Sequence, residues 1–264
     1  MKADSKVLDG RTALVFGASA GIGEAAAYAL AEAGCYVAVA ARRGSECERV
    51  AHHIRANGGG ALAHACDVAD YGAVERTVAA IDRERAQLNI LVNCAGVIQP
   101  IARLEDSDPA AWGASVGINL IGVYNGLRAT MGRFREAGAG VVVNVGSGAA
   151  EVAMEGWSAY CAAKAAVAML SKCYAEETRG TGIRVYDFRP GVVDTQMQVE
   201  VRASGINPLS KRPRGQLAPA SEPARALVWL CTDDAASFSG KFVDIRDPEV
   251  RRRSGLPVPV ALKA

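Results

Sequence analysis

The sequence predicts a single α/β domain built on a doubly wound parallel sheet, and three observations support this prediction. Short apolar runs alternate along the chain with stretches whose apolar residues recur at helical spacing. Such alternation requires crossover connections between parallel strands, with helices on both faces of the sheet. The length of 264 residues suits one domain of this kind, and the chain contains no internal repeat or evident domain linker.

The order of the elements follows from glycines and apolar runs. The first run, TALVF, ends at a glycine, and the helical pattern after it closes at Gly34. The runs VAVAA, ILVN and GVVVNV have the same buried-strand character. We expect about seven strands, near residues 12–17, 35–41, 61–66, 89–94, 140–146, 183–188 and 241–245. We expect helices near residues 22–33, 45–57, 71–86, 109–136, 157–179 and 222–232.

Three glycines follow the first strand with the spacing G-x-x-x-G-x-G, at Gly17, Gly21 and Gly23. Strand, glycine turn and helix together form the context that a dinucleotide-binding fingerprint requires. The glycines allow a tight turn and close approach to a pyrophosphate, and the helix N-terminus offers free N–H groups to it. The alternative interpretation is a glycine-rich turn between a strand and a helix without a ligand.

Tyr160 and Lys164 lie four residues apart in a predicted helix, so both side chains belong to one face. An ammonium beside a phenol favours the phenolate and makes the phenol a better proton donor. Ser147 ends the preceding strand, and its hydroxyl could hold a substrate oxygen against the phenol. By itself the tyrosine–lysine spacing is equally compatible with a half-buried ring beside a solvated amine.

Composition excludes several other classes of function. A net charge of +2 with 22% charged residues indicates neither a nucleic-acid nor a membrane partner. The first ten residues, MKADSKVLDG, lack the apolar segment of a secretory signal, and we expect a cytoplasmic protein. The seven cysteines are scattered without a C-x-x-C pair, which indicates reduced thiols and no metal site.

These motifs, taken in order, resemble those of the short-chain dehydrogenase/reductase family over essentially residues 8–246. The family pattern T-G-x-x-x-G-x-G corresponds to residues 16–23, with Phe16 in place of threonine. The pattern N-N-A-G corresponds to residues 93–96, with Cys94 in place of the second asparagine. Two later stretches, PGVVDTQMQ and SGKFVDIRD, are more similar to the sepiapterin reductase and benzil reductase branch than to ketoacyl reductases.

The resemblance implies a Rossmann-type fold and assigns roles to individual positions. The catalytic residues it implies are Asn119, Ser147, Tyr160 and Lys164. The cofactor-binding residues it implies are Gly17, Ser19, Ala20, Gly21, Ile22, Gly23, Arg42, Arg43, Asp67, Val68, Asn93, Ala95, Gly96, Tyr160, Lys164, Pro190, Gly191, Val193 and Thr195. Asp67 and Val68 would contact the adenine, while the backbone of Val193 and the hydroxyl of Thr195 would hold the carboxamide.

NADP(H) is favoured over NAD(H) by the residues after the second strand. An acidic residue there would accept hydrogen bonds from the ribose hydroxyl, but the chain has Arg42 and Arg43 instead. A guanidinium at this place can grip a phosphate, and in the family a basic residue here marks NADP preference. Ala20 occupies a position that is basic in some NADP members, so the prediction rests on Arg42 with Arg43 and Ser19.

The expected reaction is reduction of a ketone or diketone to a secondary alcohol, with hydride from the cofactor and a proton from Tyr160. The resemblance implies that Ser147 orients the carbonyl, Lys164 lowers the pKa of the phenol, and Asn119 holds a water that connects Lys164 to solvent. Candidates for the wall of the substrate pocket are Gln99, Met154, Trp157 and Met197, together with Ser147.

Three alternatives to this function stay open. The protein could act as an alcohol dehydrogenase, or as a ketoacyl-carrier reductase that meets an acidic carrier with Lys211, Arg212 and Arg214. It could also bind NADP as a sensor without turnover, although all four catalytic positions are filled. The family further implies a homodimer or homotetramer and a substrate lid over residues 195–220. The tail at 247–264, with three successive arginines, is expected to be surface-bound or disordered.

Overall fold

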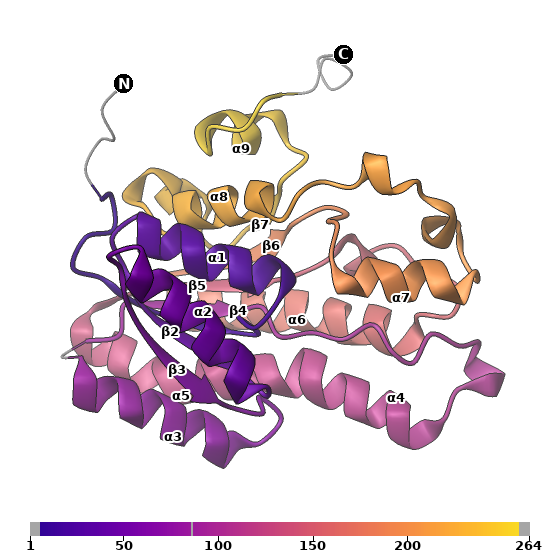
Figure 1. The fold of residues 1–264 in the computed structure, drawn as a ribbon, viewed down its shortest axis with the longest axis horizontal. Coiled ribbons are helices and arrows are strands. Elements are labelled where there is room, and N and C mark those ends of the chain that lie inside the picture. Colours follow the sequence, from indigo (N-terminus) through magenta and orange to yellow (C-terminus); the bar gives the residue numbers. More distant parts are fainter. Residues whose placement is uncertain (1–5, 86, 259–264) are drawn as a thin grey trace.

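The protein forms the α/β architecture that the sequence predicts. The computed structural model describes residues 6–85 and 87–258, drawn as a ribbon in Figure 1. Within these residues a seven-stranded sheet has the order β3-β2-β1-β4-β5-β6-β7, and every pairing is parallel. The strands are Thr12–Phe16 (β1), Tyr36–Ala41 (β2), Gly60–Ala65 (β3), Ile90–Asn93 (β4), Ala139–Val145 (β5), Gly182–Arg189 (β6) and Phe242–Asp244 (β7).

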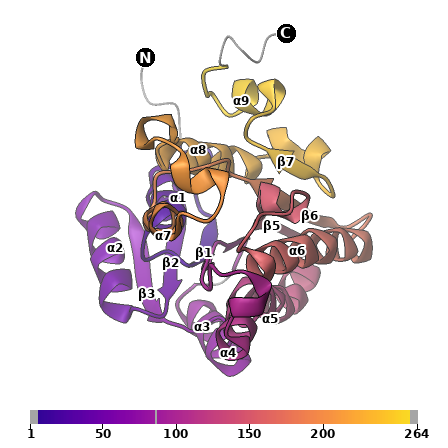
Figure 2. The same cartoon turned by 90° about the vertical axis from the view of Figure 1, so that its right-hand side faces the viewer.

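Helices cover both faces of the sheet, and Figure 2 shows the two layers from the end of the molecule. The helices are Gly21–Glu32 (α1), Gly44–Ala56 (α2), Tyr71–Glu84 (α3), Pro109–Val116 (α4), Gly122–Ala137 (α5), Ser158–Glu177 (α6), Gln196–Ser204 (α7), Ser221–Leu230 (α8) and Pro248–Arg253 (α9). Helices α1, α2 and α8 pack on one face, while α3, α5 and α6 pack on the other.

Alternation along the strands creates two separate cores. In β1, Ala13 and Val15 belong to the core under α1, α2 and α8, whereas Leu14 and Phe16 belong to the core under α3, α5 and α6. Because both faces of a parallel sheet are buried, its strands are apolar throughout instead of alternating with polar residues. This explains why the strands stand out in the sequence as continuous apolar runs.

The predicted helix at 109–136 is interrupted in the structure. Helix α4 ends at Val116, a π-helical turn spans Gly117–Ile121, and α5 begins at Gly122. The turn contains Asn119, whose side chain bonds to the backbone of Val97 in the loop after β4. A π-helical turn is common at functional sites, but nothing in the apolar periodicity marks it.

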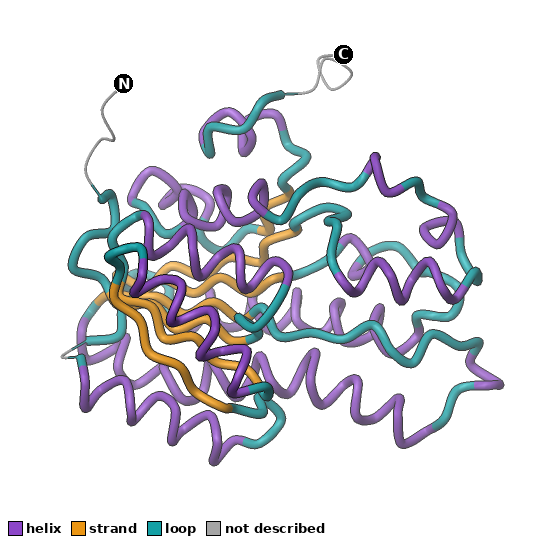
Figure 3. The backbone as a smooth tube through the Cα atoms, viewed as in Figure 1, coloured by secondary structure: helices purple, strands orange, loops and turns teal. Residues whose placement is uncertain are grey.

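Two helices lie in segments for which the sequence predicted none. Helix α7 lies in the expected lid at 195–220, and two short 3₁₀ turns follow it. Helix α9 lies in the expected tail, and Arg251 on it donates a hydrogen bond to Glu222 of α8. Residues 248–258 are therefore attached to the surface, whereas 259–264 lie outside the described residues. Figure 3 shows how much loop surrounds these two helices.

Among the residues that the structure describes, no helix combines the length and apolarity needed to cross a membrane.

Candidate active site

The expected functional residues gather where the strand order reverses. β1 lies between β2 and β4, so the chain leaves β1 and β4 toward helices on opposite faces and opens a crevice at their carboxyl ends. Gly17 follows β1, Gly96 follows β4 and Ser147 follows β5 at this edge. Parallel pairing of β1, β4 and β5 brings these three positions together although they are distant in sequence.

The glycine turn after β1 tolerates no side chain at two positions. Gly17 has a φ of +79°, and a Cβ placed on it would lie 2.5 Å from the amide nitrogen of Ala95. A Cβ on Gly23 would lie 2.3 Å from the carbonyl oxygen of Gly17. These contacts press the turn against the loop after β4 and against the start of α1. The spacing seen in the sequence therefore reflects backbone packing that only glycine permits.

The N-terminus of α1 is open toward the same crevice. Ala20 stands at the N-cap in an extended conformation, and no side chain caps the first turn. Thr195 lies beside this turn, because a Cβ on Gly21 would be 3.2 Å from its Cγ2 methyl group. Uncapped N–H groups and the positive end of the helix dipole suit a pyrophosphate. The bare glycine turn, the uncapped helix and the adjacent Thr195 fit a dinucleotide cofactor.

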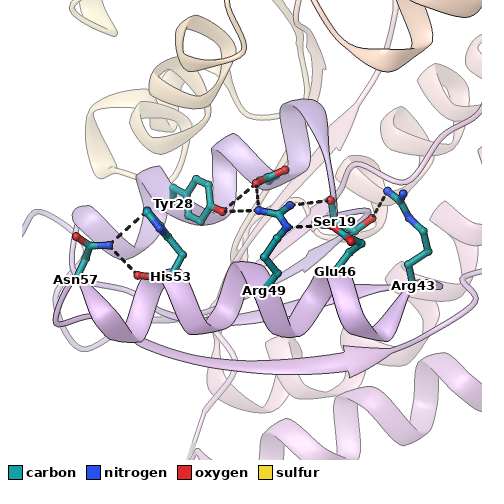
Figure 4. A network of polar contacts seen from close by, with 8 residues as sticks. Ser19, Tyr28, Arg43, Glu46, Arg49, His53 and Asn57 are labelled. Carbon is teal, nitrogen blue, oxygen red and sulfur yellow. Dashed lines mark hydrogen bonds and ion pairs between the residues drawn. The ribbon is translucent and has the colours of Figure 1, made fainter.

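A network of polar side chains borders the end of the crevice at β2, and Figure 4 shows it. Arg43 donates a hydrogen bond of 3.3 Å from Nη2 to the hydroxyl of Ser19 in the glycine turn. Arg49 is paired with Glu24 at 2.8 Å and with Glu46 at 2.9 Å. Within the described residues, neither Arg42 nor Arg43 has a carboxylate partner, so both keep their charge available for an anion. Sequence reasoning found Ser19 and Arg43 but missed the pairing of Arg49.

Three predicted cofactor residues are held by hydrogen bonds within the protein itself. The Asn93 amide donates to the side-chain oxygen of Asn144 at 2.8 Å, in the interior between β4 and β5. The backbone carbonyl of Val68 accepts from the Asn125 amide at 2.8 Å, while the Asp67 side chain accepts from the amide of Ala69. Asn93 and Val68 thus fix the loops at the strand ends, whereas the Asp67 side chain is exposed.

Three of the predicted catalytic residues come together at the carboxyl end of β5, namely Ser147, Tyr160 and Lys164. The side chains of Tyr160 and Lys164 share one face of α6, and the ammonium lies 5.7 Å from the centre of the phenol ring. Lys164 donates from Nζ to the carbonyl of Val145 at 2.7 Å, two residues before Ser147. Tyr160 is 8% exposed and Lys164 is 5% exposed. The phenol, the hydroxyl and the ammonium therefore share a largely dehydrated site.

Burial controls the protonation of this group, and it corrects one expectation. Burial raises the pKa of Tyr160 to about 12, and the hydrogen-bonding Ser147 hydroxyl opposes this rise. Burial also lowers the pKa of the Lys164 ammonium. We expected the ammonium to depress the pKa of the phenol, but loss of hydration outweighs any such attraction. At neutral pH the phenol is protonated and can donate to a substrate oxygen.

Asn119 is fully buried and its amide is largely consumed by structural hydrogen bonds. The amide nitrogen donates to the carbonyl of Val97 at 2.8 Å and to the hydroxyl of Ser115 at 3.1 Å. The amide oxygen accepts from the backbone N–H of Val97 at 3.0 Å. The side chain therefore ties the π-helical turn to the loop after β4.

An apolar cluster surrounds Tyr160 on the side away from the glycine turn. The buried members are Ile98, Ala149, Trp157, Tyr160 and Val201, and the half-buried ones are Ile101, Met154, Cys161, Met197 and Leu209. The Trp157 ring meets the Tyr160 ring edge to face, with 5.8 Å between centroids. Met154, Trp157 and Met197, which the sequence proposed for the pocket wall, thus belong to the cluster around Tyr160.

Gln99, another predicted wall residue, lies in the loop after β4. Its side chain is exposed, and its amide oxygen accepts from the backbone N–H of Ile101 at 3.0 Å. The preceding residue, Ile98, is 1% exposed and belongs to the cluster around Tyr160, a position that sequence reasoning missed. Val201 was also missed, because it is contributed by α7, a helix that apolar periodicity did not reveal.

Comparisons with known proteins agree with this site. The family model described as short chain dehydrogenase matches residues 11–205. A D-threitol dehydrogenase from Mycolicibacterium smegmatis is 37% identical over 237 residues, covering 88% of this chain and 90% of that protein. A 2,3-dihydro-2,3-dihydroxybenzoate dehydrogenase from Bacillus subtilis is 34% identical over 249 residues, covering 89% and 94%.

The fold agrees as well. A crystal structure of a 3-ketoacyl-(acyl-carrier-protein) reductase from Brucella melitensis complexed with NADH superposes with a TM-score of 0.81 and 31% identity. The superposition covers 90% of this chain and 97% of the Brucella melitensis chain. The chain belongs to the short-chain dehydrogenase/reductase family and is an oxidoreductase of alcohols and carbonyls that uses a nicotinamide cofactor.

Proposed function

We propose that the protein is an NADP(H)-dependent reductase that converts a small ketone or diketone to a secondary alcohol. The observation that carries this proposal is the buried set of Ser147, Tyr160 and Lys164 beside a glycine turn that fits a dinucleotide. The phenol, with a pKa raised to about 12, is in the form that donates a proton. That protonation state favours reduction as the working direction near neutral pH.

The cofactor would be held by the glycine turn, the α1 N-terminus and Thr195, with Lys164 and Tyr160 near its reactive end. When bound, it supplies the hydride that adds to the carbonyl carbon. Tyr160 donates its proton to the carbonyl oxygen, and Ser147 holds that oxygen through its hydroxyl. The Lys164 ammonium, fixed on Val145, stabilises the negative charge that Tyr160 acquires.

The preference for NADP(H) rests on Arg42 and Arg43. Both guanidiniums are exposed at the end of β2, and Arg43 already contacts Ser19 in the turn. A ribose 2′-phosphate would accept charge-assisted hydrogen bonds from them, whereas a ribose hydroxyl would leave both charges unused. The NADH in the Brucella melitensis structure belongs to that protein, so cofactor choice in this chain has to be measured.

The substrate class is supported by one polar atom beside Tyr160. The indole N–H of Trp157 is buried and has no hydrogen-bond partner among the described residues. A plain hydrocarbon ketone would leave it unpaired, at a cost of about 1–3 kcal/mol. A second oxygen on the substrate, carbonyl or hydroxyl, would accept a hydrogen bond from it. The two dehydrogenases named above support a substrate that bears several oxygens.

A ketoacyl-carrier reductase is the second candidate, favoured by the similarity to the Brucella melitensis enzyme. Its carrier would meet the basic segment at 211–214. Arg214, however, is paired with Asp194 at 2.8 Å, which leaves Lys211 and Arg212 to attract an acidic partner. Turnover restricted to carrier-linked substrates and suppressed by salt would favour this candidate.

The test is oxidation of NADPH and of NADH, followed by nicotinamide absorbance, with diketones, hydroxyketones, monoketones and ketoacyl thioesters. We expect turnover of the first two classes with NADPH. Tyr160→Phe should reduce kcat by at least about a hundredfold because the proton donor is lost. Tyr174→Phe, a buried phenol on the same helix, is the matched control and should retain activity. NADPH binding without turnover of any substrate would instead indicate a sensor.

A further inference from the structure

A buried carboxylate, Asp187, lies behind the catalytic group and has no role in the mechanism above. It stands in β6, in register with Asn144 of β5, which is itself in register with Asn93 of β4. The three side chains form a polar row across the face of the sheet that α6 covers. Asn93 bonds to Asn144, and Asn144 bonds to Ser171 of α6 at 2.9 Å. Asp187 stands at the end of the row and forms no hydrogen bond with its other members.

The carboxylate of Asp187 is unusually isolated. The residue is 4% exposed, and both carboxylate oxygens lack a hydrogen-bond partner among the residues that the structure describes. A buried charge without hydrogen bonds is strongly destabilising unless an opposite charge lies near it. Three cations act on this carboxylate, namely Arg189, Lys164 and Lys172. Glu151 is the remaining charged group that acts on it.

Of these cations, Lys164 is the one that is buried and, within the described residues, has no hydrogen-bonded carboxylate. Arg189 forms two hydrogen bonds of 2.8 Å with the carboxylate of Glu151. Lys172 is exposed, so water screens its charge. Lys164 is buried, and its one hydrogen bond within the described residues goes to the neutral carbonyl of Val145. The attraction between Asp187 and Lys164 therefore operates in the least hydrated surroundings.

Gly146 brings the two groups close together. A Cβ on Gly146 would lie 2.0 Å from Oδ1 of Asp187, so the carboxylate rests directly against this residue. The carbonyl that accepts from Lys164 belongs to Val145, the preceding residue, and Ser147 follows. The carboxylate and the ammonium thus contact adjoining parts of the same short segment. A side chain at position 146 would clash with the Asp187 carboxylate.

The other titratable groups around Lys164 stay neutral. Besides Asp187 on β6, they are Cys94 after β4 and Tyr160 on α6. Burial raises the pKa of the Cys94 thiol to about 11 and that of Tyr160 to about 12. Neither group carries a negative charge near neutral pH. Asp187 is the carboxylic acid among them; burial raises its pKa too, and the charges of Arg189 and Lys164 oppose that rise.

We propose that Asp187 is a positioning residue that holds the Lys164 ammonium charged and in place from the strand beneath α6. This inference rests on the proposed function, in which Lys164 acts as a cation beside Tyr160. Burial works against the charge of Lys164, and the carboxylate opposes that effect. Removal of the carboxylate should let Lys164 lose its proton at lower pH, so the reaction should lose its alkaline range first.

The experiment compares Asp187→Asn with the wild-type enzyme. The alkaline limb of kcat for carbonyl reduction should move down by about one pH unit, which is about a tenfold lower rate on that limb. Lysine side-chain NMR, with the Lys164 signal assigned through Lys164→Met, should show the same downward shift in protein without substrate. A purely structural role would lower the melting temperature without moving either titration. Asp244→Asn, an acid-to-amide change on the neighbouring strand, is the matched control.

An unchanged alkaline limb and an unchanged Lys164 titration in folded Asp187→Asn would overturn the inference. If the asparagine variant does not fold, Asp187→Val removes the charge without leaving a buried amide unpaired, and it should give the same shifts. If the wild-type protein reduces no carbonyl, the proposed function fails, and the NMR titration still decides whether Asp187 controls Lys164.

Discussion

At the scale of single residues, hydration decides how the catalytic group works. Tyr160 and Lys164 are both buried, and burial moves both pKa values toward the neutral forms. The phenol is therefore a proton donor near neutral pH, and its conjugate base is scarce. Reduction, the direction proposed above, uses this protonated phenol, whereas alcohol oxidation needs the phenol to lose its proton.

This protonation state predicts opposite pH dependences for the two directions. Alcohol oxidation needs the phenolate, whose population below a pKa of about 12 rises about tenfold per pH unit. We expect the oxidation rate to increase with pH through the neutral and moderately alkaline range. The reduction rate should not rise with it. Initial rates in both directions over a pH series check this, and an oxidation rate that is flat with pH would contradict it.

The arginines after β2 give a second prediction at this scale. Arg43→Ala removes the guanidinium that contacts Ser19, and we expect KM for NADPH to rise about tenfold or more, as for loss of one charge-assisted contact. KM for NADH should stay nearly constant because its ribose lacks the phosphate. Arg55→Ala is the control, since Arg55 lies near the other end of the same helix and pairs with Glu48. Equal effects on both cofactors would argue against a phosphate contact.

At the scale of elements, the site depends on close contacts between loops. The turn after β1 touches the loop after β4, the π-helical turn is bonded to that same loop, and Thr195 lies against the start of α1. The two ends of the 195–220 segment lie next to each other. An isolated β-bridge joins Val193 to Ala218, and a salt bridge joins Asp194 to Arg214. A segment anchored at both ends in this way is suited to cover a bound substrate, as the proposed lid requires.

The glycine turn allows a direct test of this packing. Gly23→Ala would place a methyl group 2.3 Å from the carbonyl of Gly17, so the turn has to shift. We expect a loss of about 1–3 kcal/mol in stability and severe loss of dinucleotide binding. Gly132→Ala on α5 is the control, because nothing lies within 4 Å of its added Cβ. That change should stabilise the helix slightly. Thermal unfolding and cofactor titration compare the two variants.

At the scale of the whole molecule, exposed apolar side chains predict self-association. Ile121 and Tyr124, at the start of α5, and Met169 on α6 are 43%, 48% and 59% exposed. We propose that these helices meet a second copy of the chain, as expected for a homodimer or homotetramer. Light scattering with gel filtration should give a dimer or larger, and Tyr124→Glu should shift it toward the monomer. A monomeric wild-type protein would contradict the proposal.

The sequence by itself determined the order of the strands and of the helices that connect them up to β6, the glycine turn, and the choice of Ser147, Tyr160 and Lys164 as one group. These features are visible because they rest on local rules: continuous apolar runs for doubly covered strands, glycine for forbidden Cβ positions, and helical spacing for side chains on one face. The predicted wall residues Met154, Trp157 and Met197 also lie beside Tyr160, since they are close to it in sequence or follow the last site motif.

Tertiary structure alone decided the burial, the pKa values and the long-range contacts of those residues. Burial from several elements raises the pKa of Tyr160, and no spacing in the sequence encodes it. The Asn119 amide ties the π-helical turn to Val97 in a distant loop, and in that loop the side chain of Ile98 is buried while that of Gln99 is exposed. The Asp187 carboxylate comes to lie against Gly146, next to the residue that binds Lys164, because β6 pairs with β5. Contacts between distant segments and the exclusion of water depend on the folded whole, so the sequence names the chemical groups and the fold sets their behaviour.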